Sequence, residues 1–155
     1  KRGEISLVYA GGIRNGGDVA KAMALGADAI AIGHSAMMAL NCNKQTPEAD
    51  YPKEVGAEPG YCYHCHTGRC PVGVATQDPE LRKRLDPDAA AERVYNFLHT
   101  LTIEAQMMAR ACGKTNVHSL EPEDLAALTM ESSAMAGVPL AGTEHTVGVP
   151  DYHRL

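Results

Sequence analysis

The chain has 155 residues, of which 45% are hydrophobic and 21% charged, a composition that is ordinary for a folded domain and argues against disorder. A formal net charge of −5 without a basic block disfavours nucleic acid and anionic membrane surfaces as principal partners. No apolar run reaches the roughly 18 residues of a membrane span. Because position 1 is Lys rather than Met, we expect a piece of a longer polypeptide.

The first 40 residues predict two consecutive β/α units. Strands are expected at residues 4–9 and 28–32, a glycine-rich loop at residues 10–17, and helices at residues 18–25 and 34–40. Asp18 is expected to cap the first helix, because its carboxylate can accept from free amides of the first turn. Gly26 fits the left-handed turn that ends such a helix. The second strand is continuously apolar, as buried parallel strands are.

The rest of the chain predicts an insertion followed by helices. Residues 43–60 predict a surface insertion, and the Asp-Pro pairs that begin at Asp78 and Asp86 predict two helix starts. The strongest helix signal covers residues 87–111, where apolar side chains recur at steps of three and four. This stripe comprises Val94, Phe97, Leu98, Leu101, Ala105 and Met108. Further helices are expected at residues 121–128 and 130–136, before a loose polar tail.

Glycines at equivalent places in the two β/α units indicate a phosphate site. Glycine allows close backbone approach and positive φ, and free amides at a helix start attract phosphate. In (β/α)8 barrels the loops after strands seven and eight form such a site. The candidates are Gly11, Gly12 and Ile13 on the first loop and Gly33, His34 and Ser35 on the second. Arg14 could add a contact, although a solvated loop arginine is equally expected. Tight structural turns are the alternative interpretation.

The length of the chain conflicts with a complete barrel, which needs roughly 250 residues. We therefore expect strands one to six upstream and an α/β fold class, with residues 1–41 as the last two β/α units of a (β/α)8 TIM barrel. Residues 42–78 are expected to form a cysteine-rich loop with an insertion, residues 79–140 a helical segment and residues 141–155 a polar tail. The glycine stretch resembles several barrel families, among them inosine-monophosphate dehydrogenases and FMN-dependent 2-hydroxy-acid oxidases, and specifies no reaction.

Four of the five cysteines are clustered in the sequence, which indicates metal binding. They are Cys42, Cys62, Cys65 and Cys70. An odd total without a visible secretory signal disfavours a disulfide framework, and thiolates suit zinc or an iron–sulfur cluster. Pro71 after Cys70 is typical of iron–sulfur motifs. A zinc site that includes His64 or His66 is the alternative, as are buried thiols without a metal. Cys112 is interpreted as core packing.

The segment from Cys65 to Arg82, together with the pair Asn41-Cys42, resembles the iron–sulfur loop of glutamate synthases. It reads CHTGRCPVGVATQDPELR. The resemblance covers residues 8–142 and includes stand-alone FMN-binding subunits such as the N-methylglutamate synthase large subunit. In that family three cysteines hold a 3Fe-4S cluster, and they correspond to Cys42, Cys65 and Cys70. The insertion after Cys42 and the additional thiol of Cys62 depart from the pattern, so 3Fe-4S and 4Fe-4S clusters both stay open.

The resemblance implies an oxidoreductase with FMN and an iron–sulfur cluster that forms glutamate from 2-oxoglutarate. Electrons would come from an electron-donor subunit or domain, and ammonia from a glutaminase-type one, with methylamine as the amine in the N-methylglutamate branch. This chain would bind the FMN phosphate and the cluster. No catalytic residue is assigned, because substrate-binding residues are expected upstream. The enzyme is expected to be cytoplasmic and oligomeric. The alternatives are a zinc-stabilised interaction module and a cluster-free FMN or nucleotide barrel oxidoreductase.

Overall fold

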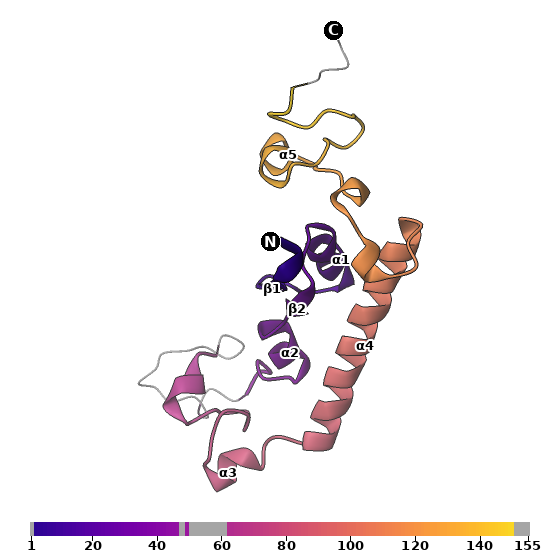
Figure 1. Cartoon of the computed structure of the whole chain (residues 1–155). Helices are drawn as coiled ribbons and strands as arrows, with labels where there is room; N and C mark the ends of the chain where they lie inside the picture. The colour runs from indigo at the N-terminus through magenta and orange to yellow at the C-terminus, as the bar shows by residue number, and fades with distance from the viewer. Residues whose placement is uncertain (1, 47–48, 50–61, 151–155) are drawn as a thin grey trace. The chain divides into compact units, whose positions relative to one another are not determined.

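The computed structural model describes residues 2–46, 49 and 62–150 (Figure 1). The chain divides into two compact units. One comprises Lys1–Ile32 and Thr100–Leu155, and the other Gly33–His99. Among the described residues, no helix is both long enough and apolar enough to cross a lipid bilayer.

A short parallel sheet begins the first unit. After a 3-10 helix, η1 (Arg2–Glu4), strand β1 (Val8–Ala10) pairs in parallel with β2 (Ala29–Ala31). The register sets Ala10 opposite Ala31. Parallel pairing of successive strands requires a crossover segment, which here contains helix α1 (Gly16–Ala24). The predicted order of strand, helix and strand is therefore confirmed.

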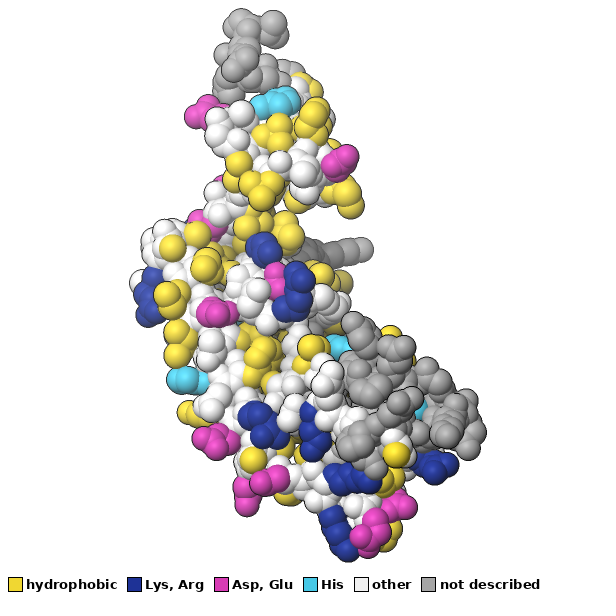
Figure 2. Space-filling model, turned by 180° about the vertical axis from the view of Figure 1, so that it is seen from behind, with side chains coloured by type: hydrophobic (Ala, Val, Ile, Leu, Met, Phe, Trp, Pro, Cys, Tyr) yellow, Lys and Arg dark blue, Asp and Glu magenta, His cyan; other side chains and the backbone are white. Residues whose placement is uncertain are grey.

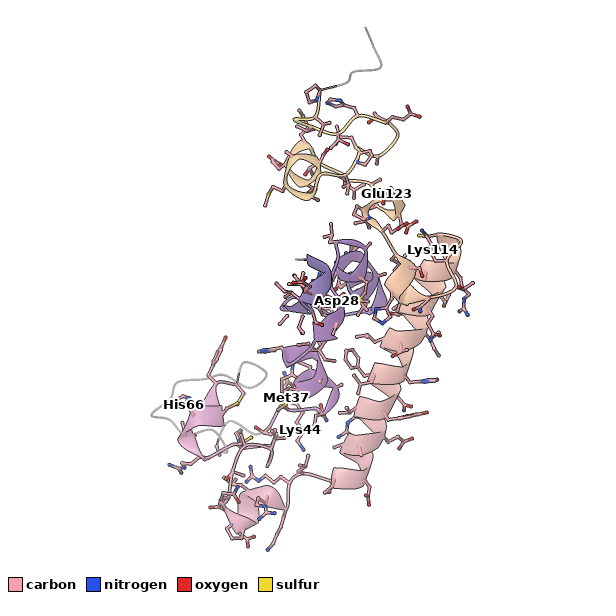
Figure 3. All side chains as sticks on the ribbon, viewed as in Figure 1. Asp28, Met37, Lys44, His66, Lys114 and Glu123 are labelled. Atoms are coloured by element: carbon pink, nitrogen blue, oxygen red, sulfur yellow. The ribbon has the colours of Figure 1, made fainter. Side chains whose placement is uncertain are left out.

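The side chain of Asp28 explains why β1 begins later than predicted. Its Oδ2 accepts a hydrogen bond from the amide of Leu7 at 2.6 Å, while the amide of Asp28 donates to the Leu7 carbonyl at 2.8 Å. The Leu7 amide is thus hydrogen-bonded to a side chain instead of a neighbouring strand, and the pairing of β1 with β2 starts at Val8. Figure 3 labels Asp28 next to the strands.

Helix α1 begins two residues earlier than predicted, because Asn15 rather than Asp18 is its cap. The Oδ1 atom of Asn15 accepts from the amide of Asp18 at 3.0 Å. Asp18 instead lies in the first turn, where its Oδ2 accepts from the amide of Arg14 at 3.1 Å. The expected left-handed end is confirmed, since Gly26 has φ 101°.

Small side chains form the core of the first unit. α1 packs there against the carboxyl-terminal half of α4 (Pro87–Ala111) and against η4 (Val117–Ser119). The buried cluster consists of Ala20, Met23, Ala24, Ala27, Ala109 and Leu120. Because most of these side chains end at Cβ, the elements that carry them can approach one another closely.

The predicted bounds of the long helix are confirmed by α4, but its apolar stripe is not uniformly buried. Ala105 is buried, whereas Leu98 and Met108 keep 41% and 46% of their surface exposed. Hydrophobic side chains reach the surface at several places on the face drawn in Figure 2. The core-facing positions of the first unit are occupied by Ala105, which the predicted stripe includes, and by Ala109, which it does not. Periodicity therefore located the helix and part of its buried face.

The segment after α4 is folded to residue 150, which makes the prediction of a loose tail wrong for the described part. The hydroxyl of Ser133, on α5 (Met130–Ala136), donates to the Val138 carbonyl at 2.8 Å and accepts from the Val147 amide at 3.0 Å. Residues 151–155 lie outside the described residues. The helix predicted at 121–128 is only the 3-10 turn η5 (Pro122–Asp124), since Leu125 is extended.

The second unit contains α2 (His34–Ala39), η3 (His64–Thr67), α3 (Pro79–Arg82) and the first half of α4. Both predicted Asp-Pro helix starts are confirmed. Asp78 Oδ1 accepts from the amides of Glu80 and Leu81 at 2.8 and 3.1 Å, and Asp86 Oδ1 accepts from two amides of α4. Most of the insertion predicted at 43–60 lies outside the described residues.

Gly16 lies in close contact with α4. A Cβ on Gly16 would overlap Glu104 Cβ and would lie 2.5 Å from both the Ala105 nitrogen and the Leu101 oxygen. Two of these three atoms are helical backbone, which cannot move without disturbing α4. A glycine is therefore required at position 16 by packing.

Substitution Gly16→Ala is expected to lower the free energy of unfolding by about 1–3 kcal/mol, because the added methyl group overpacks a rigid contact. The measurement is the urea midpoint of the full-length protein. Gly3→Ala is the matched control, since a Cβ there has no neighbour within 4 Å. Equal midpoints for the two variants would contradict the assignment.

Candidate cofactor and metal site

The loop after β1 exposes its backbone. Gly11 and Gly12 have φ values of 111° and 69°, a region that only glycine enters at little cost. A Cβ at either position would have no heavy atom within 4 Å. Ile13, the third predicted residue of this loop, is buried and anchors it. The two glycines thus offer an open stretch of backbone directly after the strand, a cradle of the kind that a phosphate requires.

The second predicted loop follows β2. β1 and β2 are parallel and in register, so they end side by side at Ala10 and Ala31. Gly33, two residues after β2, is the N-cap of α2 and provides no side-chain cap. His34 and Ser35 form the first turn of that helix. These three residues therefore lie in the loop and helix start that follow β2, as expected. Their role in binding phosphate stays a prediction.

The start of α1 is already occupied by carboxylates from the chain itself. The Gly16 amide donates to Glu104 Oε2 at 2.7 Å, and the Asp18 carboxylate lies in the same turn. A further anion at the start of α1 would meet two negative charges. Arg14 is 80% exposed and its Nε lies 3.6 Å from Asp18, which agrees with a solvated arginine.

Sequence reasoning missed Glu104. Its hydrogen bond joins residues 88 positions apart, and on α4 it is one acidic residue among several. No local motif marks such a residue, because its partner is brought to it only by the packing of α1 on α4.

The four clustered cysteines all lie in the second unit and near one another. The pKa of the Cys42 thiol is raised above its ordinary value, first by burial and then by the neighbouring thiols of Cys65, Cys70 and Cys62. The pKa of Cys62 is raised chiefly by burial, with contributions from Cys70 and Cys65. The fold therefore gathers thiols from both sides of the insertion.

Cys42 is held by the end of α2. The amides of Asn41 and Cys42 donate to the carbonyls of Met38 and Met37 at 2.8 and 3.1 Å, the pattern of a Schellman motif. Asn41 has φ 74° and is the one non-glycine residue with positive φ among those described. Asparagine tolerates this conformation better than most residues, which gives the Asn41-Cys42 pair a local structural reason.

The loop from Cys65 to Cys70 is closed by hydrogen bonds to its own backbone. The Thr67 hydroxyl donates to the His64 carbonyl at 2.8 Å, and the Thr76 hydroxyl donates to the Gly68 carbonyl. An isolated bridge pairs Arg69 with Thr76. These contacts shape the loop independently of any bound group, and sequence reasoning did not identify Thr76 as part of it.

The donor set fits a metal or cluster in its chemistry. In the described part of the chain, however, no three His, Cys, Asp or Glu side chains are arranged to hold a metal ion. Ligation would need the thiols to approach one another more closely than they do here. Cys70 is buried and Cys65 exposed. Of the two histidines considered for a zinc site, His64 is fully buried and His66 is exposed (Figure 3).

The interpretation of Cys112 as core packing is wrong, since its side chain is exposed. It follows α4 by one residue, while Ala105 and Ala109 face the core of the first unit. Cys112 instead lines a shallow, mainly apolar cavity of about 240 Å³ together with Met108 and Leu120.

The fold and the cysteine loop define an α/β chain with a parallel strand pair, an open glycine loop and a thiol-rich segment. Comparison with known proteins agrees with this class. A family model described as the conserved region in glutamate synthase matches residues 1–47 and 55–115. The chain therefore belongs to the glutamate synthase family.

Several curated relatives are similar over most of this chain. A glutamate synthase large subunit-like protein of Rhizobium meliloti is 57% identical over 140 residues, which are 90% of this chain and 31% of that protein. An archaeal NADPH glutamate synthase of Methanocaldococcus jannaschii is 44% identical over 77% of this chain and 20% of its own length. An archaeal-type NADPH glutamate synthase of Dehalococcoides mccartyi is 38% identical over 91% of this chain and 26% of its own.

The chain thus spans about a third or less of the length of these relatives. No solved structure matches it.

The charge of Asp18 is expected to make stability depend on pH. Its pKa lies below the ordinary value mainly because Lys21 donates a hydrogen bond to it, and the Arg14 amide adds to this effect. A carboxyl group with a lowered folded pKa stabilises the fold above its unfolded pKa, and this contribution is lost as pH falls through the folded pKa. Asp18→Asn should remove that part of the acid sensitivity while keeping an acceptor for the Arg14 amide.

The measurement is the urea midpoint of the full-length protein between about pH 3 and 7. Glu123→Gln, which changes an exposed carboxylate (Figure 3), is the control. An Asp18→Asn profile parallel to that of the unmodified protein would contradict the expectation.

Proposed function

We propose that this chain is the cofactor-binding end of a glutamate synthase-type oxidoreductase and that its sheet continues with upstream strands into a (β/α)8 barrel. Three observations support the proposed upstream strands. In the described residues β1 pairs only with β2, and Val8 and Tyr9 on β1 remain 57% and 47% exposed. A hollow of about 640 Å³ beside β1 is lined mainly by apolar side chains. Such an edge is an unfavourable end for a sheet.

The proposed role of the first loop is to bind the phosphate of FMN. The open backbone of Gly11 and Gly12 supports it, because amides with no side chain in front of them can donate directly to phosphate oxygens. The buried side chain of Ile13 would hold the loop in place. Gly33, His34 and Ser35 are proposed as the second group of phosphate contacts, on the basis of their position after the neighbouring strand.

The proposed role of the cysteine loop is to bind an iron–sulfur cluster through Cys42, Cys65 and Cys70, joined by Cys62 in the 4Fe-4S alternative. The observation that carries this proposal is that Cys42 has the thiols of Cys62, Cys65 and Cys70 as electrostatic neighbours, although an insertion separates them in sequence. Soft thiolates without carboxylate ligands suit iron–sulfur clusters or zinc. The family to which the chain belongs favours iron.

FMN bound here would supply hydride chemistry, and an iron–sulfur cluster would supply one-electron transfer. The residues of this chain would bind and orient these groups. The Schellman turn at Asn41 would hold the Cys42 thiol, the Thr67 and Thr76 hydroxyls would shape the loop that carries Cys65 and Cys70, and the glycine loop would anchor the phosphate. No proton-transfer residue is assigned to this chain.

For the full protein we propose 2-oxoglutarate as the acceptor, ammonia or methylamine as the amine, and glutaminase-type and electron-donor subunits or domains as partners. We also propose that the enzyme is oligomeric and cytoplasmic and that it makes glutamate or N-methylglutamate.

The decisive experiment measures iron, acid-labile sulfide, zinc and flavin in the purified full-length protein. Iron with sulfide and flavin is expected. Cys65→Ser and Cys70→Ser should each abolish most of the cluster absorbance and leave flavin bound, because serine is a poor ligand for iron–sulfur clusters. Cys112→Ser is the matched control and should retain the cluster.

Other results assign a different function. Zinc without iron would support an interaction module instead, and flavin without iron a cluster-free barrel oxidoreductase. Cys62→Ser separates the two cluster types: retention of an unchanged electron paramagnetic resonance signal indicates a three-cysteine 3Fe-4S cluster, and its loss indicates four ligands.

Substitution Gly12→Leu should lower the flavin content without loss of iron, because a side chain at positive φ is strained by roughly 1 kcal/mol or more and would stand where the phosphate is proposed to bind. Gly113→Leu is the control for backbone strain, since Gly113 has φ 74° and equally open surroundings. Equal flavin content in the two variants would speak against a phosphate site at Gly12.

A further inference from the structure

Arg84 follows α3 and contacts the segment that carries Cys70. Its Nη1 donates to the Pro71 carbonyl at 2.9 Å in a partly buried hydrogen bond. Pro71 is fully buried, and Cys70 and Val72 on either side are 4% and 2% exposed. A guanidinium is a stronger donor to such a carbonyl than a neutral group would be. The backbone next to the Cys70 thiol is therefore fixed by a charged hydrogen bond.

The backbone of Arg84 contacts the other cysteine segment. Its carbonyl accepts from Lys44 Nζ at 3.4 Å, and Lys44 lies two residues after Cys42 (Figure 3). A second arginine acts on the same segment, because Arg93 Nη2 donates to the Leu40 carbonyl at 3.4 Å. These two longer contacts are weaker than the contact to Pro71. Together they connect the Cys42 segment to the chain between α3 and α4.

The residues around Arg84 pack closely against the chain after Cys70. A Cβ added at Gly73, which has φ 84°, would lie 2.5 Å from the Leu81 carbonyl oxygen and 3.0 Å from the Leu85 nitrogen. The chain after Cys70 therefore lies against the end of α3. A small polar cavity of about 180 Å³ remains between the two cysteine segments and is lined by Asn41, Lys44, Val72, Arg84 and Arg93, among others.

We propose that Arg84 is a positioning residue that sets the separation between Cys42 and Cys70 and thereby completes the iron–sulfur site. The inference rests on the proposed function, because it assigns a role to Arg84 in that site. Its side chain holds the Pro71 carbonyl, and its main chain receives Lys44. Arg84 thus contacts both cysteine segments through its own atoms. Arg84 touches neither substrate nor cofactor in this role.

The test compares Arg84→Ala, Arg84→Lys and Lys83→Ala in the full-length protein. Lys83 is the matched control, since it is the adjacent cation and its Nζ pairs with Glu80 at 2.7 Å on the exposed surface. Arg84→Ala is expected to lose iron to a chelator roughly tenfold faster, as the loss of a charge-assisted hydrogen bond would produce, and to broaden the electron paramagnetic resonance signal of the cluster. Flavin content should stay unchanged, which shows that the fold persists.

Arg84→Lys should recover part of the iron retention, and Lys83→Ala should behave as the unmodified protein. An unchanged rate of iron loss and an unchanged resonance signal in Arg84→Ala would overturn the inference, as would an equal effect of Lys83→Ala. If Arg84→Ala does not fold, Arg84→Lys decides: a resonance signal and iron loss identical to those of the unmodified protein overturn the inference, and faster loss supports it.

A second measurement separates this inference from the proposed function. If the unmodified protein holds no iron, the proposed function fails, and the positioning role is read from the metal-free protein. Diamide treatment then oxidises pairs of nearby thiols to disulfides, which mass spectrometry locates. Coupling of Cys42 to the thiols of the 62–70 loop should be several-fold lower in Arg84→Ala than in the unmodified protein. Equal coupling would overturn the positioning role.

Discussion

The parallel pairing of β1 with β2 is the constraint on which the rest of the first unit depends. Because two successive strands run in the same direction, the chain between them must cross back, and α1 lies in that crossover. Its packing on α4 is close only because position 16 has no side chain. The same pairing sets the ends of the strands side by side, which is where the glycine loop begins.

Hydrogen bonds to the backbone hold the cysteine segments of the second unit in place. Hydroxyls of Thr67 and Thr76, a guanidinium from Arg84 and the Schellman turn at Asn41 all act on backbone atoms near the cysteines. Such bonds fix the direction of the chain. A site that must receive an inorganic group needs this kind of scaffold, because apolar packing would occupy the place of the group.

Predictions from the sequence succeeded where a local rule was sufficient. The bounds of α4, the caps at Asp78 and Asp86 and the left-handed stop at Gly26 follow from side chains acting on their own neighbours. They failed where a residue acts at a distance. The carboxylate of Asp28 shortened β1, Asn15 capped α1 in place of Asp18, Cys112 faced outward, and Ser133 fastened a tail that its composition suggested would be loose.

The sequence by itself determined the family and the β/α order, because these are carried by motifs and spacing along the chain. Only the tertiary structure decided that Glu104 fills the start of α1, that Cys42 has the other three thiols as neighbours and that Arg84 contacts both of their segments. The physical reason is that each of these relations joins residues far apart in sequence, and their meeting is set by packing and hydrogen bonds that no local pattern records.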